Sequence, residues 1–380
     1  MKKKKVPVIR NFAPVTLVFF SILLFSSAIC GAGQDLEKKV DEYIGAWTKM
    51  ERFSGSVLIA KNGKVLLGKG YGMANLEHDI SNTTQTKFRT GSVGKQFTAA
   101  CIMQLQEQGK LSVDDTLDKY IPDYPNGDKI TIHHLLTHTS GIVNVTGLPE
   151  FRQRLVFPTR LEENILLFKD KPLEFAPGER YKYSNSGYLL LGYIIEKVTG
   201  QTYEEYLKDN IFGPLGMENS GYDHPSTILK HRASGYNITP EGIINGPYND
   251  MSAPHAGGAL YSTFEDMLLW DQGLYSEKIL QKSSLDKMFT PFKGNYGYGW
   301  RIDEIFGRKR IHHGGSIVGG FQANIARYVE DKTLIVFFSN RQPANTRKIA
   351  EDLAAIVFGE AYDLPTEDDA AGRERKKQGT

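Results

Sequence analysis

The chain is poor in cysteine, in net charge and in long apolar runs. It has 2 cysteines in 380 residues, a formal net charge of +2, and a main apolar run only from about residue 13 to 25. That run is shorter than the ~20 residues that a membrane-spanning helix needs. These shortages argue against a disulfide framework and against nucleic acid as a partner. With 40% hydrophobic and 24% charged residues, the composition is that of a globular protein with a sizeable core.

Residues 1–33 have the order of a secretory leader. The basic segment MKKKKVPVIR precedes the apolar run, and small residues follow in SSAICGAGQ. This order predicts a signal peptide, with an uncleaved N-terminal anchor and membrane association as the alternative. We therefore expect an exported protein that is periplasmic, extracellular or held on the outer side of the cytoplasmic membrane. Cys30 would suit lipid attachment, but Ser27 and Ile29 fit a lipobox poorly.

Strand-like segments lie at both ends of the remaining chain, and helix-like segments lie between them. Residues 35–50 have helical spacing, and Asn62-Gly63 joins two β-rich runs in a predicted hairpin. In the middle, Gly109 and Gly200 are predicted to end helices, and Thr263 with Asp266 forms a capping-box pattern. Four strand-like segments return from about residue 295: GYGWRI, KRIHH, FQANIARYV and TLIVFFSN.

This order predicts one domain over residues 35–362 of mixed class, α/β plus all-α. An antiparallel sheet flanked by helices would form an α/β lobe from about 35–92 and 290–360. The residues from about 93 to 289 would form an inserted helical lobe. The charged tail 366–380 lacks apolar periodicity and is expected to be disordered. A cleft between the two lobes is where a small-molecule site is expected.

A serine and a lysine stand together where a helix begins, in TGSVGKQFTAACIMQLQEQGKL. Ser92 and Lys95 are three residues apart, which places them on one face. A serine hydroxyl needs a nearby base to act as a nucleophile, and a buried lysine can become one. The plain alternative is a helix-capping serine beside a solvated lysine. Cys101 falls on the apolar side of this helix and is expected to be a buried structural thiol.

Two later segments hold candidate partners. Tyr183 and Asn185 follow a Pro-Gly turn in FAPGERYKYSNSGYLLLG, and His313 and Gly315 lie in RIHHGGSIVGGF. A phenol can move protons near a lysine, an amide can bind a substrate amide, and a histidine can stand at the rim of the site. The alternatives are an ordinary tyrosine at a helix edge and a glycine-rich hairpin with an incidental histidine.

Taken together, Ser92-x-x-Lys95, Tyr183-x-Asn185 and His313-x-Gly315 resemble the three motifs of the serine β-lactamase and penicillin-binding protein superfamily. Within it, the chain resembles the class C β-lactamase-related branch of DD-peptidases, D-aminopeptidases and esterases. The resemblance covers roughly residues 40–360. It extends to four further segments: HHLLTHTSGI, FAPGERYKYSNSGYLLLG, PLGM and GGALYSTFEDMLLW.

The resemblance implies a role for each matching residue. Ser92 would be acylated, Lys95 and Tyr183 would share the acid and base work, and Asn185 would contact the substrate amide. The backbone N–H groups of Ser92 and Ser316 would form the oxyanion hole. Which of Lys95 and Tyr183 takes the serine proton stays open, and no cofactor or metal is implied.

The third motif begins with histidine, whereas class C β-lactamases have lysine there. A histidine is neutral through much of the physiological pH range, so we expect weak or no β-lactamase activity. His312 also fits the motif, although His313 fits it better. His134 and His138 have helical metal-ligand spacing without a third ligand, and we expect them to be structural. His255 is a candidate substrate contact.

We therefore expect an exported serine hydrolase that cleaves an amide or ester bond of a small molecule or peptide. D-Alanyl-D-alanine peptides derived from peptidoglycan are the first substrates to consider. The alternatives are an esterase or D-aminopeptidase, and a penicillin-binding protein that is acylated without turnover. Loops at about 144–170 and 221–256 would set the choice of substrate.

Overall fold

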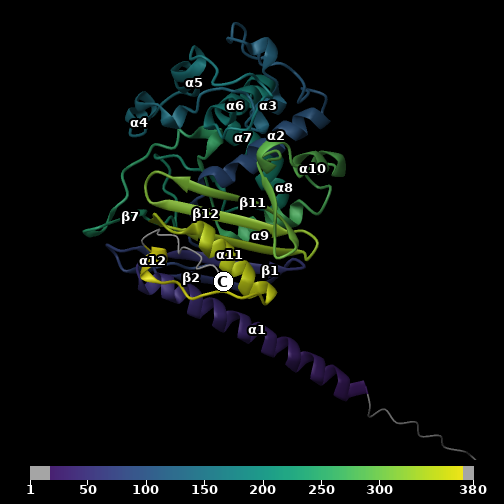
Figure 1. Cartoon of the computed structure of the whole chain (residues 1–380), viewed down its shortest axis with the longest axis vertical. Coiled ribbons are helices and arrows are strands. Elements are labelled where there is room, and N and C mark those ends of the chain that lie inside the picture. The colour runs from purple at the N-terminus through teal and green to yellow at the C-terminus, as the bar shows by residue number, and fades with distance from the viewer. Residues whose placement is uncertain (1–17, 371–380) are drawn as a thin grey trace, which may run out of the picture.

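The centre of the molecule is a six-stranded antiparallel sheet whose strands come from both ends of the chain (Figure 1). The computed structural model describes the backbone of residues 18–370 and the side chains of residues 34–369. The strand order is β10-β11-β12-β13-β1-β2, and β13 pairs with β1. The strands are β1 (Gly55–Lys61), β2 (Lys64–Tyr71), β10 (Arg301–Ile305), β11 (Arg308–Ile317), β12 (Phe321–Tyr328) and β13 (Thr333–Ser339).

The hairpin between β1 and β2 turns at Asn62 and Gly63, as predicted. Both residues have positive φ, 52° and 72°, which a two-residue hairpin turn of the favoured twist requires. The turn sets the register in which Lys61 faces Lys64. The sequence of the turn therefore fixes the N-terminal edge of the sheet.

Both faces of the sheet are buried, and alternate residues of β1 enter different cores. Val57 and Ile59 join a cluster that includes α1 (Val18–Lys49) and α11 (Thr346–Phe358). Leu58 and Ala60 join the larger cluster on the other face, with the helices of the middle of the chain. Because a strand alternates its side chains, a continuous apolar run buries both faces at once. The sheet is therefore a layer between helices.

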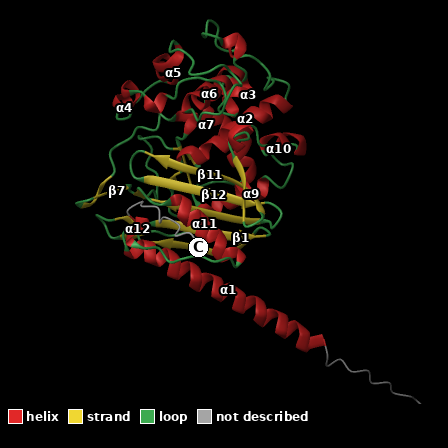
Figure 2. Cartoon of the chain, viewed as in Figure 1, coloured by secondary structure: helices red, strands yellow, loops and turns green. Residues whose placement is uncertain are grey.

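The middle of the chain supplies most of the helices, which gather beyond one side of the sheet (Figure 2). Figure 2 also shows α1 at the opposite side of the sheet. The helices are α2 (Lys95–Glu107), α3 (Ile132–Leu136), α4 (Pro149–Arg154), α5 (Leu161–Lys169), α6 (Asn185–Thr199), α7 (Tyr203–Leu207), α8 (Gly213–Leu215), α9 (Phe264–Gly273) and α10 (Lys282–Met288). Gly109 and Gly200 lie just beyond α2 and α6 with φ of 68° and 71°, as predicted for helix ends.

Short strands that the sequence pattern did not predict lie within the middle segment and on either side of it. They form small sheets of two or three strands, and a strand of two to four residues is too short to show an alternating pattern. These strands are β3 (Met73–Asn75), β4 (Ile80–Ser81), β5 (Phe88–Arg89), β6 (Gly221–Tyr222), β7 (Tyr236–Thr239), β8 (Gly242–Asn245), β9 (Leu260–Ser262) and β14 (Arg341–Gln342).

Helix α9 packs against β1 and β13 of the sheet, although its sequence lies in the segment predicted as the helical lobe. A buried ion pair joins it to the sheet, because Nε of Arg327 lies 2.6 Å from Oδ1 of Asp271. Its N-terminus has half of the predicted capping box. The Thr263 hydroxyl accepts the Asp266 N–H, but the Asp266 carboxylate accepts hydrogen bonds from residues 219 and 220 instead.

One prediction at the C-terminal side is wrong in detail. The segment GYGWRI becomes a strand only at Arg301, because Gly297 and Trp300 close a turn with a hydrogen bond of 2.8 Å. At the start of the tail expected to be disordered, a short helix, α12 (Glu367–Ala370), follows Thr366. The Thr366 N–H donates to the Asp369 carboxylate at 2.8 Å, which is a capping interaction that the apolar pattern does not reveal. Residues 371–380 lie outside the described part of the chain.

The predicted leader lies partly outside the described residues, which begin at residue 18. Helix α1 starts there and continues through the predicted 35–50 segment, and Figure 1 shows its N-terminal end pointing away from the sheet. Val40, Tyr43, Ile44 and Trp47 on its C-terminal half are buried. Across residues 18–370, no helix combines the length and apolar character that crossing a bilayer requires.

Candidate active site

Ser92 lies in a single helical turn, Gly91–Gly94, that leads directly into α2. Gly91 has φ of 53°, and a Cβ at that position would stand 2.9 Å from the backbone nitrogen of Ser316. The turn therefore lies against the end of β11, and a side chain at residue 91 would separate them. Ser92 itself is partly exposed and lines a cavity of about 580 Å³.

Lys95 is the first residue of α2 and is fully buried. Its Nζ lies 3.1 Å from Oγ of Ser92, 2.8 Å from Oδ1 of Asn185 and 2.6 Å from the carbonyl oxygen of Gly257. Among the described residues no carboxylate pairs with the amine, and burial lowers its pKa to about 7. A substantial fraction of Lys95 is therefore the free amine near neutral pH.

Tyr183 and Asn185 reach the same point from the start of α6. The Tyr183 hydroxyl donates to Oγ of Ser92 at 2.9 Å. Burial raises the pKa of Tyr183 above its usual value, so the phenol keeps its proton at neutral pH. The Asn185 amide nitrogen lies 3.3 Å from both Oδ1 of Asn144 and the hydroxyl of Thr146. These two contacts direct the Asn185 amide oxygen toward Lys95.

The two histidines of the third motif lie on opposite faces of β11. His313 points to the side of Tyr183, with ring centroids 6.3 Å apart, whereas His312 contacts the carboxylate of Asp303 on the other side. The expectation of a basic ring at the rim is wrong, because His313 is 3% exposed and its Nε2 lies 2.8 Å from the Tyr296 hydroxyl. Burial and then the charge of Lys95 lower the pKa of His313 to about 3, so the ring is neutral.

Gly315 lets β11 lie against the Ser92 turn. A Cβ there would stand 2.0 Å from the carbonyl oxygen of Thr90 and 3.3 Å from the nitrogen of Ser92. Strand β11 is an inner strand of the sheet, but β10 pairs with it only through His312, so residues 313–317 have a free edge beside the turn. The expectation of an edge strand is therefore correct only for residues 313–317, at the C-terminal end of β11. Ser316 lines the cavity, and its hydroxyl accepts a hydrogen bond from Gln342.

His134 and His138 do not form a metal site with each other. His134 caps α3, with Nδ1 accepting the Thr131 N–H, while His138 lies beyond the helix at φ of 57°. His138 is buried, its ring lies 4.2 Å from that of Tyr183, and its Nδ1 accepts the Ser184 N–H. Among the described residues, no group of three or more His, Cys, Asp or Glu side chains could hold a metal ion.

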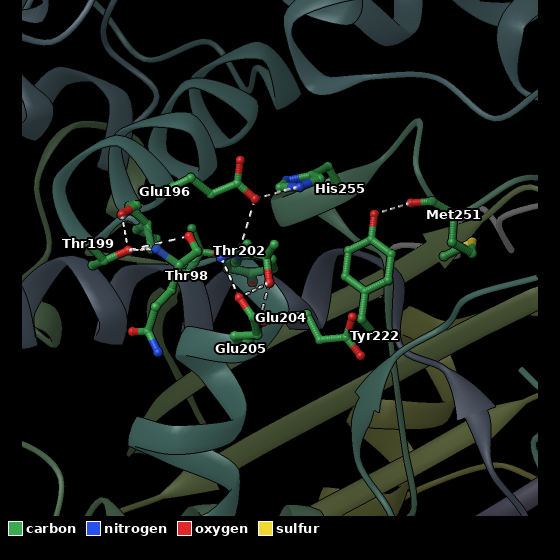
Figure 3. Close-up of polar contacts among 12 residues, drawn as sticks. Thr98, Glu196, Thr199, Thr202, Glu204, Glu205, Tyr222, Met251 and His255 are labelled. Carbon is green, nitrogen blue, oxygen red and sulfur yellow. Dashed lines mark hydrogen bonds and ion pairs between the residues drawn. The ribbon is translucent and has the colours of Figure 1, made fainter.

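His255 is not among the described residues that line the cavity, contrary to its expected role as a substrate contact. Figure 3 shows its ring turned toward Glu196 of α6, with Nε2 3.5 Å from the carboxylate. Residues 255–257 form a turn whose last carbonyl, that of Gly257, accepts from Lys95. The hydroxyl of Thr98 donates to the carbonyl of Ala256 in the same turn. His255 thus supports the turn that holds Lys95.

The loops predicted to set the choice of substrate do line the cavity. One wall comes from residues 145–155, and another from Asn249 and Pro254. The sequence reading missed three contributors: Asn144, which holds Asn185, Tyr296, which holds His313, and the Gly257 carbonyl, which holds Lys95. Asn144 and Tyr296 belong to none of the motifs, and although Gly257 begins the segment GGALYSTFEDMLLW, the role of its backbone carbonyl has no sequence signal. Cys101 is fully buried, as predicted.

A sheet layered between helices, with a serine at a cavity and a buried lysine and a tyrosine in contact with its hydroxyl, defines a serine hydrolase of the β-lactamase and penicillin-binding protein type. The chain belongs to the family described as Beta-lactamase, which matches residues 39–358. This membership confirms the family resemblance and the fold class that the sequence predicted.

Relatives of the chain include penicillin-binding proteins and a hydrolase. It is 33% identical over 319 residues to the "Putative penicillin-binding protein PbpX" of Bacillus subtilis (strain 168), covering 83% of this chain and 76% of that one. It is 26% identical to a teichoic acid D-alanine hydrolase of Staphylococcus aureus (strain MRSA252), covering 82% and 75%. The octameric penicillin-binding protein homologue from Pyrococcus abyssi has a similar structure, with a TM-score of 0.75 and 33% identity, covering 86% and 77%.

Proposed function

We propose that this protein is an exported serine hydrolase that cleaves an amide or ester bond through an acyl-enzyme, and that D-alanyl-D-alanine peptides are its first substrate class. The observation that carries the proposal is the contact of Ser92 Oγ with both Lys95 Nζ, at 3.1 Å, and the Tyr183 hydroxyl, at 2.9 Å. The leader-like residues 1–33 support export. The names of the relatives support a cell-wall substrate.

Lys95 is the better base of the two candidates. A neutral amine has two N–H donors and one lone pair, and the Asn185 amide oxygen and the Gly257 carbonyl can accept both donors. The lone pair is then left for the hydroxyl proton of Ser92. Tyr183 cannot take this role easily, because its raised pKa keeps the phenol protonated.

Acylation then proceeds with one bond formed and one broken. Oγ of Ser92 attacks the carbonyl carbon as its proton passes to Lys95, and backbone N–H groups of Ser92 and Ser316 stabilise the oxyanion. The Tyr183 phenol protonates the leaving amine or alcohol as the scissile bond breaks, and the proton held by Lys95 restores the phenol. Water then hydrolyses the acyl-enzyme, which releases the acid and returns the proton to Ser92.

An esterase or a D-aminopeptidase is the second candidate. The relative named teichoic acid D-alanine hydrolase favours a D-alanine substrate other than a D-alanyl-D-alanine peptide, and the neutral His313 provides no fixed cation beside the reacting serine. The third candidate, a penicillin-binding protein without turnover, has the same acylation step and lacks only deacylation.

Turnover measurements separate these candidates. The purified protein is incubated with an N-acylated D-alanyl-D-alanine peptide, a D-alanine amide, a p-nitrophenyl ester and a fluorescent penicillin. We expect release of D-alanine from the dipeptide and a penicillin adduct that decays. Hydrolysis of the ester with none of the dipeptide would favour the esterase. A penicillin adduct that persists for hours, with no turnover of any substrate, would contradict hydrolase function.

A further inference from the structure

The cavity beside Ser92 contains a charged residue that none of the sequence motifs includes. Among the described residues that line it, Arg152 has the only charged side chain. Arg152 lies on α4, and its Nε donates to the backbone carbonyl of Thr146 at 3.4 Å. No acidic side chain forms an ion pair with it among the described residues. A guanidinium anchored by one N–H still has four N–H donors to offer.

The remaining walls of the cavity are largely apolar. They suit an aliphatic chain that passes from the reacting carbonyl toward Arg152. The apolar residues are Val145, Phe151, Leu155, Leu189, Pro254, Ile317 and Val318.

The cavity takes the acyl part of the substrate rather than the leaving group. Ser92, Asn185 and Ser316 line it, whereas Tyr183, which protonates the leaving group in the proposed reaction, is not among the described lining residues. The leaving group therefore departs on the Tyr183 side, and the acyl group extends into the cavity.

We infer that the cavity is an acyl-group subsite for an aliphatic chain that ends in a carboxylate, with Arg152 binding the carboxylate. This inference rests on the proposed function and specifies its substrate class as acidic acyl groups. A planar guanidinium suits a carboxylate because it can donate two parallel hydrogen bonds. The subsite places the charge selectivity on α4, away from the third motif with its neutral His313.

Matched esters test the subsite. The mono-p-nitrophenyl ester of adipic acid has a terminal carboxylate, and p-nitrophenyl hexanoate has the same chain length without it. We expect kcat/KM for the adipate ester to exceed that for the hexanoate ester by about 10- to 100-fold, the range for a hydrogen-bonded charge pair. Arg152→Gln should reduce this ratio to about 1, and Arg152→Lys should leave an intermediate ratio because Lys lacks the fork.

The matched control is Arg154→Gln, on the same helix. Arg154 is not among the described residues that line the cavity, and it donates to a backbone carbonyl of α5. It should leave the preference for the adipate ester unchanged.

The results separate the subsite from the reaction itself. Equal kcat/KM for the adipate and hexanoate esters in the unmodified protein would overturn the subsite, provided that a fluorophosphonate still labels Ser92. An equal loss with both esters in Arg152→Gln would also overturn it, because a structural defect would not discriminate by charge. Failure of the fluorophosphonate to label Ser92 would instead reject the proposed reaction.

Discussion

Nζ of Lys95 lies 2.6 Å from the carbonyl oxygen of Gly257, although 162 residues separate them in the chain. This contact and the one to Asn185 occupy two hydrogen bonds of the amine and direct the remaining position at Ser92. Burial then keeps the pKa of Lys95 near 7. The helix entrance, the start of α6 and the turn 255–257 together prepare one amine for proton transfer.

Removing the amine should nearly abolish acylation. In Lys95→Ala, Ser92 loses the proposed base, and we expect acylation by a labelled penicillin to slow by about 100- to 10,000-fold, the usual contribution of a general base. The measurement is the rate of adduct formation at fixed pH. Cys101→Ala is the control, because Cys101 is buried on the same helix and takes no part in the chemistry. Similar slowing in both variants would mean that the defect is structural.

Acylation should depend on pH through Lys95. The ammonium cannot accept the Ser92 proton, so the second-order rate constant should rise with pH and level off above about 7, where Lys95 loses its proton. Stopped-flow measurements of this rate constant from pH 5 to 9 should show the rise and the plateau. A rate that stays constant from pH 5 to 9 would contradict Lys95 as the base.

The same buried amine should make stability depend on pH in the alkaline range. The pKa of Lys95 is about 7 in the folded protein, against 10.5 as its ordinary value. Between these two values the unfolded chain binds more protons, so the free energy of unfolding should rise as pH increases from 7 toward 10.5. Urea unfolding compared between the unmodified protein and Lys95→Met measures this term. If the curves of unfolding free energy against pH were parallel for the two proteins, Lys95 would not contribute to the pH dependence of stability.

Tyr183→Phe should affect poor leaving groups most. The variant keeps the ring but loses the hydroxyl 2.9 Å from Ser92 Oγ. An amine must be protonated to leave, whereas p-nitrophenolate leaves without a proton. We therefore expect a loss of about 100-fold or more with peptide substrates and a much smaller loss with p-nitrophenyl esters. An equal loss with both would show that the phenol does not protonate the leaving group.

Glu196 should influence Lys95 through His255, without touching either Ser92 or the cavity lining. In Glu196→Gln, the charge 3.5 Å from the His255 ring is lost, and the turn that presents the Gly257 carbonyl is held less firmly. Misplacement should slow acylation by about 10- to 100-fold. The rise of the acylation rate constant with pH should shift to lower pH, because a weaker acceptor stabilises the Lys95 ammonium less.

The matched control for that variant is Glu204→Gln. Glu204 lies on the neighbouring helix α7 and pairs with His224 instead of His255. Glu204→Gln should leave both the acylation rate and its dependence on pH unchanged. If Glu196→Gln lowered only the amount of folded protein, with an unchanged rate per active site, the link from His255 to Lys95 would be wrong.

Two adjacent glycines of β11 should respond in opposite ways. In Gly315→Ala, the new Cβ would stand 2.0 Å from the Thr90 carbonyl oxygen, so β11 must move away from the Ser92 turn. We expect acylation to fall by about 100-fold or more as the oxyanion donors separate. In Gly314→Ala, the nearest atoms would be 3.8 Å away, and acylation should persist. Equal tolerance of both substitutions would contradict the close approach.

The sequence predicted the parts of this site that have side chains in a fixed spacing. Ser92 with Lys95 and Tyr183 with Asn185 are short local patterns at the starts of α2 and α6. The hairpin at Asn62 likewise has its own turn signature. The sequence did not predict the environment of His313, because burial against Tyr296 depends on a contact between distant segments. Likewise, the Gly257 carbonyl has no residue-type signal, and short strands such as β6 and β9 have no period to detect.

The measurement that tests the central claim most directly is the mass of the peptide that contains residues 92–95 after reaction with a fluorophosphonate or a labelled penicillin. We expect the adduct on Ser92, formed by one equivalent of reagent per chain, and no adduct in Ser92→Ala. An adduct on a different serine, or undiminished labelling of Ser92→Ala, would contradict the assignment of Ser92 as the nucleophile.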